Sequence, residues 1–362
     1  MPIDEQAIGT PLKIRTEYYL KQLKLEKTIA KAFQAEHIDG LDKACGRYII
    51  FDLSRSYWHD LGTLLWLIAV LHKLRIQGND IQLIFPEPTD SKGEKLWDFL
   101  LRWQFFHALS LCVDQPANLL SRKQLSHLDR VSQYRHAKGT DQFGDETVLH
   151  TLRILEISTF SAEEKDPEQV EKQQRQFDKL EGQVIVGALS QMCGWDNQVT
   201  RTFMQRVLRE GIRNSLLHAK GSFVNLSMRL DAKNLTLAIS DNGAGIPRVL
   251  RAAFQESGAR KKLLKYSDAD LIKYFTEPEM ILDSKLIRIS TEKGVSSESE
   301  RAGVGLYYLK SHVLKQKGEL RIRAGKACVD FTSRKTDAND ALLESPGTLL
   351  RIQTPLENVS NA

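Results

Sequence analysis

The chain has 362 residues, which is long for one domain and favours about two. Its hydrophobic content of 41% and charged content of 27% are ordinary for globular domains that bury a core. The net charge of +5 is small for this length, so the composition gives no case for a nucleic-acid or membrane partner. The 4 cysteines are far apart and form no C-x-x-C pair, which favours free thiols in a reducing compartment over a zinc site or a disulfide framework.

The sequence shows no targeting or membrane segment. The first residues contain neither a basic region nor an apolar one, so we expect no secretory signal. The most apolar stretch, 61–74, is too short to cross a bilayer. We therefore expect a soluble protein of the cytoplasm.

The first third of the chain predicts a small α/β domain. The expected elements are a charged amphipathic helix over 11–37, a strand over 47–53, a helix over 61–74, a strand over 80–86 and a helix over 94–109. Asp60 is placed to cap the second of these helices. Because strands and helices alternate, we expect at least two parallel strands.

The chain is expected to divide into four parts. They are an N-terminal helical segment at 1–40, an α/β domain at 41–125, a connecting region at 126–194 and a second domain at 195–356. Residues 161–182, inside the connecting region, are almost entirely charged or amide, so they predict an exposed helix or a linker.

A helix predicted over 199–218 carries polar side chains in an apolar sector. Glu210, Asn214 and His218 are spaced i, i+4 and i+8 and point away from the arginines of the same helix. A carboxylate there would lose several kcal/mol of hydration unless something compensates it. One interpretation is a polar stripe at the edge of the core, with His218 capping the helix. The functional one is that Asn214 supplies an oxygen to Mg²⁺ while Glu210 faces a transferring phosphate as a base.

Alternating strands are predicted over 223–230 and 235–241. Asp241 continues the phase of the aliphatic residues before it, so it points to the buried side, where the exocyclic amine of adenine would serve as its donor. Gly243 and Gly245 permit positive φ and a close approach to a flat ligand. A plain hairpin turn is the alternative. The residues after Gly245, however, are typical of a helix.

A glycine-rich segment, Gly303-Val304-Gly305-Leu306, precedes a helix predicted over 307–317. Such an entry presents backbone N–H groups and the positive end of the helix dipole to an anion. The long segment before it is rich in lysine and arginine and fits a mobile lid over phosphates. The alternative is a solvated insertion whose lysines contact no ligand.

These three motifs, in this order, resemble the N, G1 and G2 boxes of the Bergerat-fold (GHKL) ATPases, the superfamily of gyrase, the heat-shock chaperone ATPase, histidine kinases and MutL. The resemblance covers about 195–356 and implies a two-layer α/β sandwich, with a mixed sheet covered on one face by helices. It implies ATP and Mg²⁺ as ligands, Glu210 as the catalytic residue and Asn214 as the metal ligand. The residues implied to contact ATP are Asn214, His218, Asp241, Gly243, Gly245, Ile246, Gly303, Val304, Gly305 and Leu306.

Within that superfamily, the spacing of Glu210, Asn214 and His218 is similar to that of the anti-sigma-factor serine kinases. The segment 51–60 and the elements after it resemble a STAS domain, the fold of the antagonists that such kinases phosphorylate. The acceptor hydroxyl of that family would fall near Leu61 or Gly62, neither of which has one. The resemblance therefore implies a degenerate STAS-like module for docking or dimerisation.

The expected function is use of the γ-phosphate of Mg-ATP, either by transfer to a protein serine or threonine or by hydrolysis in an ATPase switch. The alternative is a non-catalytic module whose partner-binding face changes with ATP. A nucleic-acid-acting ATPase ranks last because the chain lacks a basic aromatic face. We expect a protein partner, with a STAS-like protein and a second copy of the chain as candidates.

Overall fold

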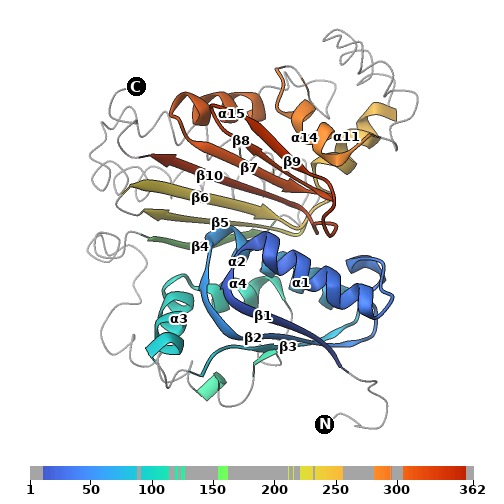
Figure 1. Cartoon of the computed structure of the whole chain (residues 1–362), viewed down its shortest axis with the longest axis vertical. Helices are drawn as coiled ribbons and strands as arrows, with labels where there is room; N and C mark the ends of the chain where they lie inside the picture. Colours follow the sequence, from blue (N-terminus) through green and yellow to red (C-terminus); the bar gives the residue numbers. More distant parts are fainter. Residues whose placement is uncertain are drawn as a thin grey trace. The chain divides into compact units, whose positions relative to one another are not determined.

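The computed structural model describes residues 11–87, 91–113, 119–120, 124–126, 154–161, 211, 215, 221–230, 233–255, 281–293, 295 and 305–355. The chain forms two compact units, 1–148 and 149–362 (Figure 1). No helix among these residues is long and apolar enough to cross a membrane.

Unit 1 is a small α/β unit around a three-stranded sheet. Its elements are β1 (Leu12–Leu20), α1 (Gln22–Ala35), the 3-10 helix η1 (Leu41–Lys43), β2 (Tyr48–His59), α2 (Leu61–Ile76), β3 (Asp80–Ile84), α3 (Ser91–Arg102) and α4 (Phe105–Cys112). The strands lie in the order β1-β2-β3, and both pairs are parallel. The predicted parallel arrangement of two strands is confirmed.

Helix α2 begins and ends at side chains that bind its free backbone groups. Asp60 Oδ1 accepts a hydrogen bond of 3.2 Å from the backbone N–H of Thr63, so the predicted cap is confirmed. After the helix, the buried Asn79 donates from Nδ2 to the carbonyls of Ala44 (2.5 Å) and Leu74 (2.7 Å). These bonds fix the turn that leads into β3.

The prediction of one helix over 11–37 is wrong for its first half, which is strand β1. Leu12, Ile14 and Thr16 are buried while Lys13 and Arg15 are exposed, so this stretch has the period of two that belongs to a strand. Because β1 pairs with β2, its alternate residues face the core and are buried. Helix α1 then begins at residue 22.

The single helix predicted over 94–109 is two helices, α3 and α4. The chain turns at Gln104, whose φ of 52° is left-handed. This turn lets both Phe105 and Phe106 contact Phe85, with ring centroids 6.3 and 5.7 Å apart. Aromatic packing against Phe85, the residue after β3, therefore favours two helices over one continuous helix in this segment.

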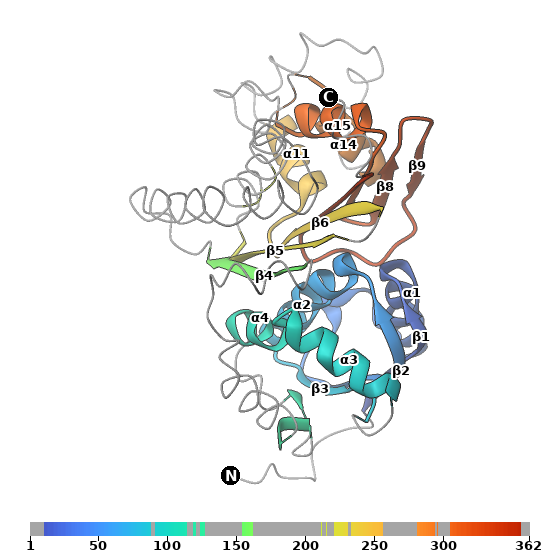
Figure 2. The ribbon, with the colours of Figure 1, turned by 90° about the vertical axis from the view of Figure 1, so that its left-hand side faces the viewer.

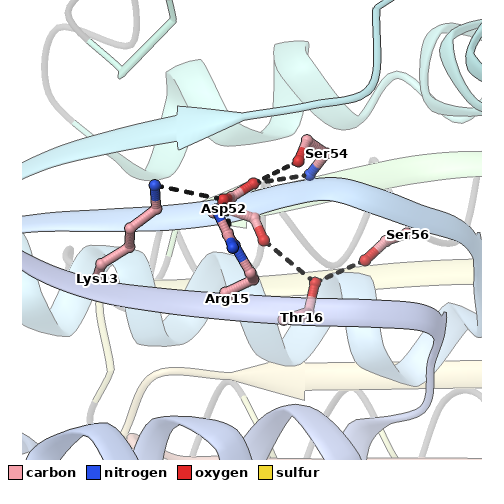
Figure 3. A network of polar contacts seen from close by, with 6 residues as sticks. All are labelled: Lys13, Arg15, Thr16, Asp52, Ser54 and Ser56. Carbon is pink, nitrogen blue, oxygen red and sulfur yellow. Dashed lines mark hydrogen bonds and ion pairs between the residues drawn. The ribbon is translucent and has the colours of Figure 1, made fainter.

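A buried carboxylate pins β1 to β2 where their register shifts (Figure 3). Asp52 is 4% exposed and accepts hydrogen bonds from Ser54 Oγ (2.6 Å) and Arg15 Nε (2.9 Å). Burial raises the pKa of Asp52, but these hydrogen bonds outweigh it and hold the pKa below its ordinary value. Beside it, the hydroxyls of Thr16 and Ser56 lie 2.6 Å apart. The network holds the irregular part of the parallel pair together.

Unit 2 is built on a seven-stranded sheet. Its elements are β4 (Ile154–Ser161), β5 (Phe223–Leu230), β6 (Asn234–Asp241), α11 (Ile246–Gln255), α14 (Asp283–Ser290), α15 (Gly305–Lys315), β7 (Glu319–Ala324), β8 (Ala327–Phe331), β9 (Thr336–Asn339) and β10 (Thr348–Pro355). The strand order is β4-β5-β6-β10-β7-β8-β9. Figure 2 shows α11, α14 and α15 gathered on one face of this sheet.

The α/β class predicted for the chain is confirmed, and so are the predicted strands over 223–230 and 235–241. Each neighbouring pair among the described strands of unit 2 is antiparallel, so the mixture of directions that we expected is not found among them. Strand β4 pairs with β5, although the sequence put residues 154–161 in a connecting region. The domain bounds drawn from the sequence stay predictions.

Two apolar clusters form the core of unit 2. The larger one joins the helix-facing side of the sheet to α15 through Leu309 and Val313. The smaller one joins α11 to α14 through residues such as Phe254 and Leu286. Ile246 packs against both clusters, so the start of α11 is held at their junction.

Candidate functional site

The candidate site lies where β6 ends and β10 begins. Asp241, the last residue of β6, is 2% exposed. Its Oδ1 accepts hydrogen bonds from the backbone N–H groups of Gly243 (3.0 Å) and Thr348 (3.1 Å). The side chain of Ser215 hydrogen-bonds to the same carboxylate. One carboxylate thus connects the loop after β6, the start of β10 and a helical residue.

Burial is the main influence on the pKa of this carboxylate. Desolvation raises the pKa of Asp241 to about 6, although the hydrogen bonds from Gly243, Thr348 and Ser215 act in the opposite direction. At neutral pH the group is therefore mostly ionised and still incompletely compensated. It is suited to accept a further hydrogen bond from a ligand.

Three glycine-bearing segments meet beside Asp241. Gly245 has a φ of 76°, and a Cβ there would lie 3.5 Å from the carbonyl oxygen of Gly347 and 3.7 Å from the nitrogen of Gly325. A Cβ on Gly347 would lie 2.1 Å from the carbonyl oxygen of Asp241. At Gly347 the backbone is packed too closely for a side chain, whereas at Gly245 the space would accept a Cβ and the positive φ is what favours glycine. The predicted positive φ is found at Gly245, whereas Gly243 contributes its N–H group.

Asn242 fixes the turn that follows β6. Its Oδ1 accepts from the backbone N–H groups of Ser222 (2.8 Å) and Phe223 (3.0 Å), and its Nδ2 donates to Ser222 Oγ (2.7 Å). The end of β6 is thereby tied to the start of β5. The chain then enters α11 rather than a returning strand, so the hairpin alternative is excluded.

Only part of the predicted site lies within the described residues. Asp241, Gly243, Gly245 and Ile246 are brought together, and Gly305 and Leu306 open α15. The predicted residues outside the described part of the chain are Glu210, Asn214, His218, Gly303 and Val304.

Two described residues of the segment that carries the first motif, Gly211 and Ser215, lie next to β6. Gly211 and Ser215 are helical, buried and four residues apart, so they lie on one face. A Cβ on Gly211 would lie 2.5 Å from Ile239 Cδ1, and Ser215 reaches Asp241. Sequence reasoning missed Ser215, Asn242 and Thr348. The strand-like pattern of the segment that begins at Gly347 could have indicated that Thr348 starts a strand.

The described edge fits the base end of a nucleotide. An acceptor-only carboxylate is buried among glycine backbones, which suits a flat ligand that offers an N–H donor. Among the described residues, no group of three or more His, Cys, Asp or Glu could hold a metal ion.

The raised pKa of Asp241 predicts a particular pH dependence of stability. Between pH 4 and 6 the folded protein binds more protons at Asp241 than the unfolded chain, so the free energy of unfolding falls as pH rises through this window. A shift of this size corresponds to about 3 kcal/mol. Urea unfolding of the wild type and Asp241→Asn at pH 4, 5, 6 and 7 measures it. The stability of the wild type relative to the variant should fall with pH and then level off. A difference that is constant across this range contradicts the buried carboxylate.

Comparison with known families agrees with this geometry. Residues 200–358 match the family model described as histidine kinase-, DNA gyrase B- and HSP90-like ATPase. The match supports the GHKL superfamily for that part of the chain and, at the level of the family, ATP binding with an ATPase-like or kinase-like function. No curated protein was found to match the chain.

Proposed function

We propose that residues 195–356 bind Mg-ATP and that the protein uses the γ-phosphate of ATP, as a serine/threonine kinase-like enzyme or as an ATPase switch. One observation carries the proposal: Asp241 is a buried carboxylate with a raised pKa, and it lies in a segment that matches an ATPase family. We place the protein in the cytoplasm.

At the base end, Asp241 accepts the exocyclic amine of adenine, and Gly243, Gly245 and Ile246 form the wall of the pocket. The hydrogen bonds from Thr348 and Gly243 support this role because they aim the carboxylate before the ligand arrives.

At the phosphate end, the N-terminus of α15 receives the phosphates. Gly303, Val304, Gly305 and Leu306 offer backbone N–H groups there. The positive end of a helix of 11 residues stabilises the anion.

The catalytic step depends on the helix of the first motif. Glu210 takes the proton from the attacking hydroxyl or water, an effect of about 10²- to 10⁴-fold. Asn214 gives an oxygen to Mg²⁺, and His218 contacts the nucleotide one turn further on. Magnesium, when bound, neutralises charge on the phosphates.

Unit 1 serves, in this proposal, as a docking or dimerisation module rather than as a substrate. The hydroxyl nearest to the acceptor position of STAS domains belongs to Thr63, which is 0% exposed and donates to the carboxylate of Asp60. Because this hydroxyl is buried, it is a poor phosphate acceptor. In the proposal the component that unit 1 docks is therefore a partner protein, either a STAS-like one or a second copy of this chain.

The test follows the γ-phosphate of labelled ATP with the full chain, alone and with candidate STAS-like proteins. Stable label on a protein supports the kinase, and free phosphate alone supports the ATPase. Glu210→Ala should lower the rate about 10²- to 10⁴-fold with little change in ATP affinity. Glu344→Ala removes an exposed glutamate of the same unit and serves as the control. If Glu210→Ala changes neither the affinity nor the rate, the enzyme assignment is wrong, and an ATP-dependent conformational switch is the function that stands.

A further inference from the structure

Two carboxylates tie the N-terminus of α14 to loops near the candidate site. Asp283 Oδ2 accepts a hydrogen bond of 2.6 Å from the backbone N–H of Lys326, in the β7–β8 turn. Its Oδ1 lies 2.5 Å from Arg251 Nη2 of α11. Asp340 accepts from the N–H (2.7 Å) and Oγ (2.6 Å) of Ser284 and so caps α14 from the loop before β10.

The β7–β8 turn connects Asp283 to the base end of the site. Gly325 has a φ of 55°, and a Cβ there would lie 2.1 Å from Asp283 Oδ2. On its other side, the nitrogen of Gly325 lies 3.7 Å from the Cβ position of Gly245. The carbonyl of Gly325 accepts from the N–H of Ser345 at 2.7 Å, two residues before Gly347. The turn is therefore held between Asp283 and the glycines beside Asp241.

Helix α14 is held by contacts of its own, so the position of Asp283 does not depend on the β7–β8 turn alone. At its C-terminal end, Lys310 Nζ of α15 donates to Thr291 Oγ1 (2.9 Å) and Glu292 Oε1 (2.8 Å). Its apolar face packs against α11 in the smaller core cluster. With 8 residues, the helix spans about 12 Å.

We propose that Asp283 is a positioning residue of the adenine pocket: it holds the Gly325–Lys326 turn against Gly245 and so sets the width of the base end. The inference rests on the proposed function but not on catalysis. In this proposal Asp283 acts on the base end without contacting the nucleotide, through its hydrogen bond to the backbone N–H of Lys326. A charge-assisted bond to a backbone N–H is strong enough to fix such a turn.

The experiment measures the affinities of adenosine, ADP and ATP for the full-length wild type, Asp283→Ala and Asp283→Asn by calorimetry, at a temperature where all three are folded. Because only the base end changes, Asp283→Ala should weaken all three ligands by one common factor, about tenfold. Asp283→Asn keeps an acceptor for the N–H of Lys326 and should recover part of the loss. If Asp283→Ala does not fold, Asp283→Asn tests the proposal instead, and it should still lower the affinities of the three ligands by one common factor.

The matched control is Asp337→Ala on β9, whose side chain is 58% exposed and pairs with Lys335. It should leave all three affinities unchanged. A loss confined to ATP, or unchanged affinities in both Asp283 variants, overturns the positioning role. If the wild type binds none of the three ligands, the proposed function fails instead, so the two failures are distinguishable.

Discussion

Replacing Asp241 by asparagine should abolish ATP binding while the protein stays folded. The amide keeps the shape of the side chain, and its oxygen still accepts from the N–H groups of Gly243 and Thr348. Its NH₂ group, however, faces the donor of the ligand. A lost charge-assisted hydrogen bond and an opposed pair of donors should lower ATP affinity at least about 100-fold. Calorimetric titration with ATP measures the loss.

The same substitution should not destabilise the ligand-free protein. At neutral pH the wild type keeps a charged group buried, at a cost of about 3 kcal/mol that the neutral amide avoids. Urea unfolding should therefore show an unchanged or higher free energy. Asp337→Asn, on the exposed β9, is the control for removing a carboxylate and should alter neither quantity. Tight ATP binding by Asp241→Asn would contradict the proposal that Asp241 binds adenine.

The features of the fold and of the site that the sequence predicted are those set by local sequence: strand periodicity, a helix cap and a turn. The phase of Leu235, Leu237 and Ile239 placed Asp241 on the buried side, and the structure confirms that burial. Asp60 was recognised as a cap because capping acts over three residues. The positive φ of Gly245 likewise follows from a local turn from strand to helix.

The parts that sequence missed depend on distant partners. Thr348 donates to Asp241 across 107 positions, and Lys326 donates to Asp283 across 43. No periodicity reports such contacts, because both donors are backbone N–H groups that any residue except proline would supply. The prediction of a helix at strand β1 fails for a related reason. The strand is stabilised by pairing with β2, whose partner residues lie 37 or more positions further along the chain.

Replacing Gly347 by alanine should strongly destabilise unit 2 and also weaken ATP binding. The added Cβ would lie 2.1 Å from the carbonyl oxygen of Asp241, 2.7 Å from its carbonyl carbon and 2.8 Å from its Oδ1. The first two of these are backbone atoms of β6, which cannot rotate away as the end of a long side chain can. The strand must therefore shift, at a cost of about 3 kcal/mol or more. Urea unfolding and hydrogen exchange in β6 and β10 measure the loss.

Gly78→Ala separates this steric effect from backbone strain. Gly78 has a φ of 75°, but a Cβ there meets nothing within 4 Å, so only the left-handed conformation opposes alanine. That strain should cost about 1–2 kcal/mol and leave ATP affinity unchanged. The shift forced at Gly347 moves Asp241 itself, so its effect on ATP must accompany its effect on stability. If Gly347→Ala is no more destabilising than Gly78→Ala and binds ATP normally, the edge is not closely packed, and the backbone there does not position the carboxylate.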